Sequence, residues 1–338
     1  MARILVTGGA GYIGTHTCVE LTAAGYEVVV LDNLCNSRAT AIVRSSELAG
    51  TSIAFVQMDI RDHLSIRRLL RDRAIDAVVH LAGLKVVAES FRQPLDYYAN
   101  NLAGSVTLLK AMADEGVRTL VFSSSAAVFG GSADAPIAED AAREPASPYG
   151  RTKMFVELAL RDLARSDPAW RIGILRYFNP VGAHPSGRIG ECPLAAPQNL
   201  VPYLCMVAGG RLPYLRVFGD DYATADGTGI RDYIHVADVA RAHVAAIKWL
   251  GAHPGAHTWN LGTGEGASVL DVIRAFESVS GRSIPFRVVE RRAGDVAKCY
   301  ADPGKAEREL GWRAERALTE MCRDAWHWQS RNPDGYPS

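Results

Sequence analysis

The sequence lacks the marks of an exported, membrane-spanning or metal-stapled protein. Its six cysteines form no Cys-x-x-Cys pair and no zinc-ligand pattern with a nearby histidine. No run approaches about eighteen apolar residues, and the first ten residues already read as a strand entering a glycine loop, which leaves no room for a signal peptide. We therefore expect reduced thiols, no metal, no membrane contact and a cytoplasmic location.

An excess of charge of one sign is also missing. Lys plus Arg and Asp plus Glu both number 37, so the net charge is zero. Such a chain has no global field that would gather nucleic acid, and any anionic ligand must be bound by local groups. The 338 residues, of which 48% are apolar, suffice for one large or two fused domains with a sizeable core.

Short runs of β-branched residues alternate with amphipathic stretches in the first half, as in βαβ units on a parallel sheet. The pattern predicts strands at 3–7, 27–32, 53–58, 77–81, 119–123 and 171–176. Helices are expected at 12–24, 64–73, 95–115 and 148–165. These elements indicate an α/β fold with a doubly wound parallel sheet, the Rossmann arrangement.

After about residue 180 this pattern gives way to Pro- and Gly-rich segments with shorter helices and strands. We expect a first domain at 1–180 and a second, smaller mixed α/β domain at 181–338. The boundary is soft, because later segments such as 234–250 could pack back on the first sheet.

A glycine loop follows the first expected strand. The segment TGGAGYIG, residues 7–14, has glycines at 8, 11 and 14 that allow a tight turn and close approach of the backbone to a pyrophosphate. Asp32 ends the second strand, where a carboxylate accepts hydrogen bonds from a ribose diol and repels a 2′-phosphate. The combination predicts NAD rather than NADP. The alternative is a flexible turn beside a solvated aspartate.

The next strand ends extend this expected cofactor site. Asp59 and Ile60 follow the third strand and would flank an adenine, and Leu81, Ala82 and Gly83 follow the fourth and would line the rest of the cofactor.

Tyr149 and Lys153 lie four positions apart at the start of an expected helix, in the only Tyr-x-x-x-Lys pair of the chain. A phenol with a pKa of about 10 is a poor base, but a nearby ammonium and a helix N-terminus favour its phenolate. Ser125 lies at the carboxyl end of the fifth strand, where such sheets bind ligands. The three residues predict acid–base chemistry; the alternative is three unrelated surface groups.

At this point the whole chain resembles the extended short-chain dehydrogenase/reductase family, and within it the enzymes that invert carbon 4 of UDP-hexoses. The resemblance rests on the segments TGGAGYIGTHTCVEL, LDNLCNS, HLAGLKVVAES, YYANN, SPYGRTK, LRYFNPVGAHPSG, GTGIRDYIHV, RRAGD and DAWHWQSR. It implies that residues 1–180 bind NAD and that residues 181–338 bind a UDP-hexose.

Position by position, the expected cofactor contacts are Gly8, Gly11, Tyr12, Ile13, Asp32, Asn33, Asp59, Ile60, Leu81, Ala82, Gly83, Lys85, Asn100, Tyr149, Lys153 and Phe178. The expected substrate contacts are Ser125, Asn179, Asn199, Leu200, Arg231, Arg292, Asp295 and Cys299. Arg231 and Arg292 suit a diphosphate, because a guanidinium offers paired charged hydrogen bonds.

The resemblance implies a reversible 4-epimerisation of UDP-galactose and UDP-glucose through a 4-ketopyranose. Tyr149 would remove the hydroxyl proton as hydride passes to NAD, Lys153 would lower the tyrosine pKa and hold the ribose, and Ser125 would hydrogen-bond the substrate oxygen. A homodimer is also implied, through helices at 98–112 and 149–165. Their outer faces are expected to carry Leu102, Leu109, Phe155 and Leu158, which could instead face the core.

Departures from the family pattern bear on specificity and on rival functions. Cys299 stands where narrow-pocket relatives have Tyr, so turnover of UDP-N-acetylhexosamines is a hypothesis, and a mere packing change is its alternative. A 4,6-dehydratase or decarboxylase would need an acid and a base where Ala126 and Ala127 stand. A non-catalytic NAD-binding regulator would not need the Tyr and Lys that are present here.

Overall fold

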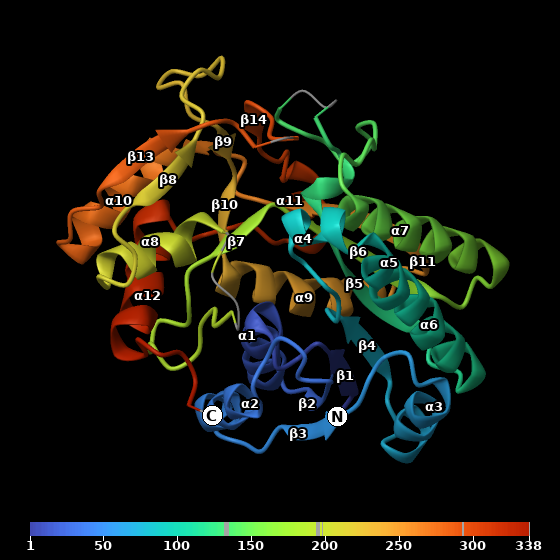
Figure 1. The fold of residues 1–338 in the computed structure, drawn as a ribbon. Helices are drawn as coiled ribbons and strands as arrows, with labels where there is room; N and C mark the ends of the chain where they lie inside the picture. Colours follow the sequence, from blue (N-terminus) through green and yellow to red (C-terminus); the bar gives the residue numbers. More distant parts are fainter. Residues whose placement is uncertain (132–134, 194–196, 198, 293, 338) are drawn as a thin grey trace.

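A seven-stranded parallel sheet forms the centre of the molecule (Figure 1). The computed structural model describes residues 1–131, 135–193, 197, 199–292 and 294–337. The strands lie in the order β11–β6–β5–β4–β1–β2–β3, so the order reverses between β1 and β4, the place where ligands bind in such sheets. The strands are β1 (Arg3–Thr7), β2 (Glu27–Asp32), β3 (Ala54–Gln57), β4 (Ala77–His80), β5 (Thr119–Ser125), β6 (Arg171–Tyr177) and β11 (Gly255–Leu261).

Helices cover both faces of this sheet. Along β1, Ile4 and Val6 contribute to one core and Leu5 to another, which is the two-residue period of a strand buried on both sides. One face packs against α1 (Tyr12–Ala23), α2 (Ala39–Ala49) and α9 (Val236–Leu250), and the other against α3 (His63–Asp72), α6 (Gly104–Asp114) and α7 (Pro148–Ser166). The expected doubly wound α/β fold is confirmed.

The six expected strands are all present, although β3 is shorter than the expected range 53–58. The expected helix 95–115 is a continuous run of α5 (Pro94–Tyr97), a π-helical turn η1 (Tyr98–Ala103) and α6. The sequence pattern missed α2 and the seventh strand, β11.

Segments from beyond residue 180 complete the large sheet and its cover. As expected for 234–250, α9 packs back: its Val239 lies in the same core as Leu21 of α1. Strand β11 pairs with β6 in parallel along its whole length. The division of the chain at residue 180 stays a prediction.

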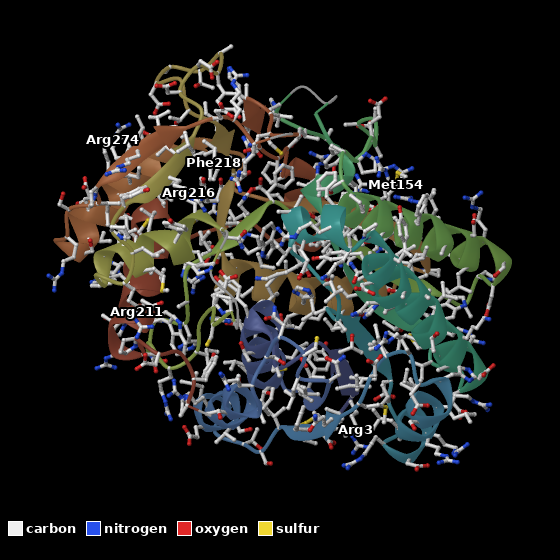
Figure 2. All side chains as sticks on the ribbon, in the orientation of Figure 1. Arg3, Met154, Arg211, Arg216, Phe218 and Arg274 are labelled. Carbon is white, nitrogen blue, oxygen red and sulfur yellow. The ribbon has the colours of Figure 1, made fainter. Side chains whose placement is uncertain are left out.

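The rest of the described chain is a smaller mixed α/β region, as expected. Its strands are β7 (Asn179–Val181), β8 (Leu215–Phe218), β9 (Ile230–Arg231), β10 (Tyr233–His235), β12 (Ala267–Ser268), β13 (Phe286–Val289) and β14 (Lys298–Cys299). Its main helices are α8 (Leu200–Ala208), α10 (Val269–Ser280) and α12 (Leu318–Arg331), and short helices elsewhere are α4 (Val87–Arg92), η2 (Ala126–Val128) and α11 (Gly304–Leu310). Figure 2 labels Arg216 and Phe218 on β8 of this region.

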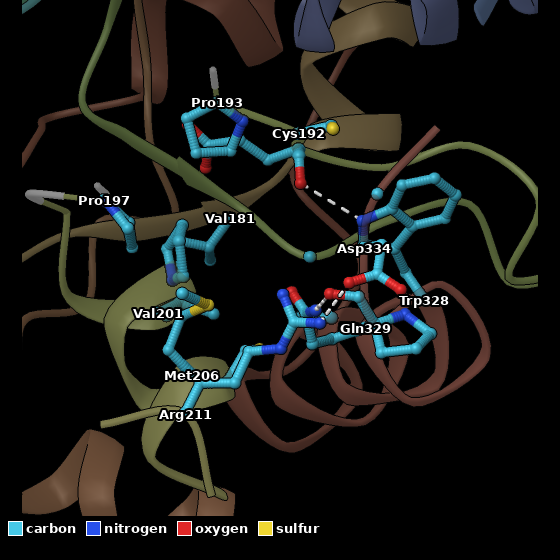
Figure 3. A pocket seen from close by; sticks show the side chains of 17 residues that line it. Val181, Cys192, Pro193, Pro197, Val201, Met206, Arg211, Trp328, Gln329 and Asp334 are labelled. Atoms are coloured by element: carbon cyan, nitrogen blue, oxygen red, sulfur yellow. Dashed lines mark hydrogen bonds and ion pairs between the residues drawn. The ribbon is translucent and has the colours of Figure 1, made fainter. Parts of the chain in front are cut away.

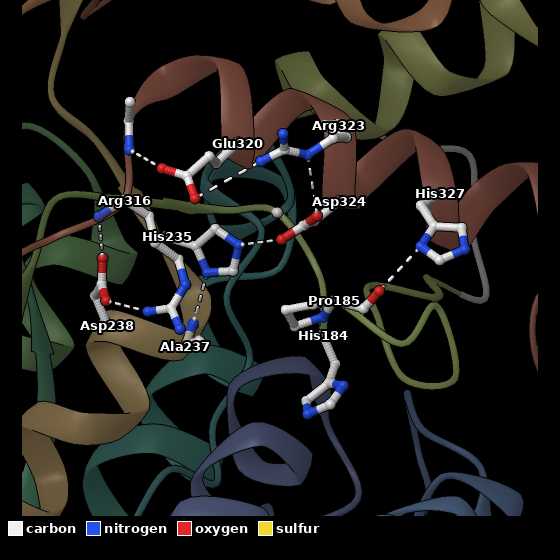
Figure 4. A network of polar contacts seen from close by, with 12 residues as sticks. His184, Pro185, His235, Ala237, Asp238, Arg316, Glu320, Arg323, Asp324 and His327 are labelled. Carbon is white, nitrogen blue, oxygen red and sulfur yellow. Dashed lines mark hydrogen bonds and ion pairs between the residues drawn. The ribbon is translucent and has the colours of Figure 1, made fainter.

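A polar network ties this region to α9 (Figure 4). His235 caps α9 by accepting a hydrogen bond from the Ala237 N–H at 3.0 Å, and its other ring nitrogen donates to Asp324 of α12 at 3.2 Å. Asp238 accepts from the backbone N–H groups of Glu315 and Arg316, both at 3.1 Å. Because α9 is part of the core of the large sheet, these bonds fix the small region against it.

One expectation about exposed apolar residues is wrong. Leu109 is only 7% exposed, because it lies with Met112 on the side of α6 that packs on the sheet. Leu102 is partly buried against the same core. Phe155 and Leu158 of α7 are exposed at 37% and 39%. None of the described helices combines the length and the apolar character needed to span a bilayer.

Candidate active site

The glycine loop is pressed tightly against the end of β4. Gly8 has a φ of +71°, and a Cβ there would lie 2.6 Å from the backbone nitrogen of Ala82. At Gly14, a Cβ would lie 2.3 Å from the carbonyl oxygen of Gly8. Side chains at these positions would collide with backbone, so the loop needs glycine to bring its N–H groups and the first turn of α1 to the sheet edge. This cradle fits a dinucleotide pyrophosphate.

Two carboxylates stand beside the cradle, where the sequence places them. Buried Asp32 accepts from the N–H groups of Leu34 at 2.8 Å and Ala10 at 3.1 Å, so its side chain is held next to the loop. Asp59 accepts from the Asn33 side chain at 3.1 Å, and the Arg61 guanidinium holds the pKa of Asp59 well below its usual range. The predicted residues Asp32, Asn33 and Asp59 therefore lie together. These groups fit the ribose and adenine end of NAD.

The segment after β4 is fixed by an asparagine that sequence reasoning missed. The buried Asn101 side chain accepts from the Leu84 N–H at 2.8 Å and donates to the Leu84 carbonyl at 2.9 Å. The expected contact, Asn100, lies one residue earlier in the π-helical turn and is partly buried. Its role toward NAD stays a prediction. The adjacent asparagines of YYANN were the available sequence signal, but only their different burial in the folded protein distinguishes Asn101 from Asn100.

The structure brings Ser125, Tyr149 and Lys153 together at the carboxyl end of β5. A Cβ at Gly150 would lie 2.5 Å from the Ala127 carbonyl oxygen, so glycine allows the first turn of α7 to rest on the chain just after Ser125. The buried Lys153 Nζ donates to the Ser123 carbonyl at 2.7 Å and lies 6.0 Å from the Tyr149 ring centroid.

Burial and charge set the protonation of these groups. Burial raises the pKa of the Tyr149 phenol, and a hydrogen bond with Ser125 acts against that rise. Burial lowers the pKa of Lys153 to about 8, while the charge of Glu157 acts in the opposite direction. An ammonium this close to the phenol favours the phenolate. The arrangement can therefore move a proton to and from a substrate hydroxyl.

Glu157 is a second group that sequence reasoning missed. Its carboxylate is fully buried and accepts from Ser124 Oγ at 2.6 Å and from the Arg176 guanidinium at 2.7 and 2.9 Å. It thereby joins α7 to β5 and β6, directly beside the predicted catalytic residues. Its position four residues after Lys153, on the same helix face, was the signal that could have revealed it.

The predicted diphosphate contacts form a second cluster. Asp295 lies 3.6 Å from the Arg231 guanidinium and 3.3 Å from that of Arg292, so two positive charges face one negative charge. Arg292 also stacks over the Phe218 ring at 4.4 Å, a contact that sequence reasoning missed. Residue 293 of the RRAGD segment lies outside the described residues.

Strand β14 lies between the cluster around Tyr149 and the cluster around Arg231. Cys299 pairs in register with Arg231 of β9, and its side chain packs with Phe129 and Phe178, close to the end of β5. The remaining predicted substrate contacts lie on nearby elements: Asn179 begins β7, Asn199 is the N-cap of α8, and Leu200 is the first residue of α8. Individual contacts of all these residues with NAD or substrate stay predictions.

A separate cavity of about 270 Å³ lies between α8, α12 and the chain around Cys192 (Figure 3). Val181, Val201, Met206 and Trp328 are among its lining residues. None of its described lining residues is a predicted site residue, and its volume is below the range typical of drug-sized ligands. The cavity therefore shares no predicted residue with the candidate active site, although its lining residues Gly182 and Glu191 are bonded to Tyr12 and Lys85 of that site.

Comparison with known proteins agrees with this geometry. A model of the NAD dependent epimerase/dehydratase family matches residues 4–262. The chain belongs to this family. It is 54% identical over 335 residues to the UDP-glucose 4-epimerase of Bacillus subtilis (strain 168), covering 99% of both chains. This confirms the resemblance seen in the sequence motifs.

Solved structures of family members are equally similar. One is the UDP-glucose-4-epimerase of Stenotrophomonas maltophila with bound NAD and formylated UDP-arabinopyranose, with a TM-score of 0.97 and 53% identity over 98% of this chain and 99% of that one. Another is the UDP-glucose 4-epimerase of Bifidobacterium longum in complex with NAD+ and UDP, with a TM-score of 0.96 and 47% identity over 99% of this chain and 100% of that one.

Proposed function

We propose that this protein interconverts UDP-galactose and UDP-glucose by NAD-dependent inversion of carbon 4. The observation that carries the proposal is the placement of Tyr149, with Ser125 and Lys153, at the sheet edge beside the glycine loop. High identity to named epimerases over nearly the full length supports it.

The glycine loop and Asp32 would hold the pyrophosphate and a ribose of NAD, and the bound cofactor would supply the hydride chemistry needed at carbon 4 of the sugar. Tyr149 takes the hydroxyl proton at that carbon and gives it back, while the Lys153 ammonium stabilises the phenolate. Ser125 donates a hydrogen bond to the substrate oxygen. Arg231 and Arg292 bind the diphosphate, so the nucleotide is held while the keto sugar turns between its two faces.

The alternative dehydratase chemistry lacks its residues here. Elimination of water needs an acid and a base next to the substrate, and the two residues after Ser125 are Ala126 and Ala127. Incubation with UDP-galactose should give UDP-glucose without net NADH formation or loss of water. A 4-keto-6-deoxy product, or no conversion at all, would contradict the proposal.

We further propose that N-acetylated UDP-hexoses are also substrates. Cys299 lies at the junction of the two clusters, and a cysteine there leaves more room than a tyrosine would. Kinetics on both pairs of sugars test this proposal; no N-acetyl activity in the wild type would end it.

We also propose a homodimer formed through α7 and its neighbours. The exposed Phe155 and Leu158 on α7 support it, and the buried Leu109 contributes nothing to such a surface. A monomeric mass by light scattering would contradict it. The cytosolic location expected from the scattered cysteines stays a prediction.

A further inference from the structure

An ion pair joins the segment after β4 to the chain between β7 and α8. Lys85 Nζ lies 2.6 Å from Glu191 Oε1, although the two residues are 106 positions apart. The Glu191 side chain is 13% exposed and that of Lys85 is 44% exposed. A pair sheltered on one side loses less of its strength to solvent than a fully exposed pair does.

Both ends of this pair are anchored. The Glu191 carbonyl accepts a hydrogen bond from the indole N–H of Trp328 at 3.1 Å, and Trp328 is buried beside the cavity of Figure 3. On the other side, Asn101 holds both backbone groups of Leu84, the residue before Lys85. Glu191 and Lys85 therefore both project from stretches of backbone that are held in place.

The pair lies beside the glycine loop. Lys85 Nζ is 6.0 Å from the ring centroid of Tyr12, which belongs to the glycine loop and is the first residue of α1. The Tyr12 hydroxyl donates to the Gly182 carbonyl at 2.7 Å, which is a second link between the loop and the chain after β7. Tyr12 and Lys85 are thus both bonded to the chain that follows β7, next to the backbone cradle that fits a pyrophosphate.

We propose that Glu191 is a positioning residue for the cofactor: its carboxylate holds Lys85 beside the glycine loop and so slows release of the dinucleotide. A lysine ammonium has three N–H donors. Glu191 takes one of them, which leaves two for a phosphate or ribose oxygen and removes the entropy cost of orienting the side chain on binding.

Slow release of the cofactor matters for the proposed function, on which this inference rests. An epimerase that loses its reduced cofactor while the keto sugar is bound cannot return the hydride. A bridge that adds nothing to the chemical step but keeps the dinucleotide in place therefore raises the fraction of turnovers that are completed.

The test is the rate at which protein-bound NAD exchanges with isotope-labelled NAD, followed by mass spectrometry of the holoprotein. Glu191→Gln keeps the shape of the side chain and removes its charge, so exchange should become roughly fivefold faster. Glu47→Gln is the matched control, because the exposed ion pair of Glu47 with Arg188 joins α2 to the same stretch of chain. It should exchange at the wild-type rate.

Glu191→Asp serves if the glutamine variant does not fold. It keeps the charge and shortens the side chain, and it should also exchange faster than the wild type. Exchange in a folded Glu191 variant that is as slow as in the wild type, or slower, overturns the proposal, as does an equal acceleration in Glu47→Gln. Failure of the wild type to convert UDP-galactose would instead contradict the proposed function, and the exchange rates would still report on Glu191.

Discussion

The two ends of the candidate active site differ in how their charges are held. At the predicted catalytic end, Lys153 and Glu157 are buried and held by hydrogen bonds to β5 and β6. At the predicted diphosphate end, the Arg292 side chain is 51% exposed and shares one carboxylate with Arg231. The side chains of the first end are therefore held in position by packing before substrate arrives. At the second end, an accessible guanidinium remains available to bind a phosphate.

The largest expected effect follows from removing the one hydroxyl that moves the proton. Tyr149→Phe should lower kcat about a thousandfold, because the variant loses the general acid–base catalysis that the phenol would provide. The NAD content after purification should match the wild type, since the ring and the ammonium of Lys153 remain. Near-normal turnover by this variant would show that the catalytic end has been misassigned.

The buried carboxylate at the same end is the next target. Glu157→Gln leaves the Arg176 guanidinium buried and uncompensated, so unfolding free energy should fall by about 3 kcal/mol, measured by urea denaturation. Asp162→Asn, at an exposed pair with Arg165 on the same helix, is a control that should change stability little.

Substitution of Glu157 should also shift the pH dependence of turnover. The Lys153 ammonium is present below its pKa of about 8, and the Glu157 charge raises that pKa. Removing the charge lowers the pKa of Lys153, so the alkaline loss of kcat should move to lower pH in Glu157→Gln. If the alkaline limb of the pH profile stayed in place or moved to higher pH, Glu157 would not control the protonation of Lys153.

The diphosphate end should respond in binding rather than in chemistry. Arg292→Gln removes a charged hydrogen-bond donor, so KM for UDP-galactose should rise roughly thirtyfold with kcat nearly unchanged. Arg274→Gln, on the exposed surface of α10, provides the control and should leave KM unaltered. If Arg292→Gln lowered only kcat, Arg292 would act in the chemical step, and the division into a catalytic end and a binding end would be wrong.

The smallest effect is expected where the two ends meet. Cys299→Tyr should lower kcat/KM for UDP-N-acetylgalactosamine roughly tenfold, because the ring fills space beside the sugar, with little change for UDP-galactose. Equal losses on both substrates would indicate a packing defect rather than a specificity change.

Local motifs made much of this structure predictable. The glycine loop, Asp32 and the Tyr149–Lys153 pair sit within single strand–helix units, so their spacing alone predicted where they would lie. The missed features depend on contacts between distant segments. Strand β11 is recognised by its pairing with β6, and Asn101 is separated from Asn100 only by burial.

The substrate end shows the same limit. Arg231, Arg292 and Asp295 were expected from resemblance to the family. That both guanidiniums share the Asp295 carboxylate, and that Arg292 stacks on Phe218, becomes visible only when β8, β9 and the 290s segment are brought together. The pairing of Glu191 with Lys85 likewise has no local signal, because the two residues lie 106 positions apart in the sequence.

The central claim is that one bound cofactor removes the hydrogen of carbon 4 and returns that same hydrogen to the opposite face. UDP-galactose carrying deuterium at carbon 4 tests it directly, with nuclear magnetic resonance of the UDP-glucose formed. We expect the deuterium to remain at carbon 4 of the product. Replacement of the deuterium by solvent hydrogen at that carbon would contradict the account.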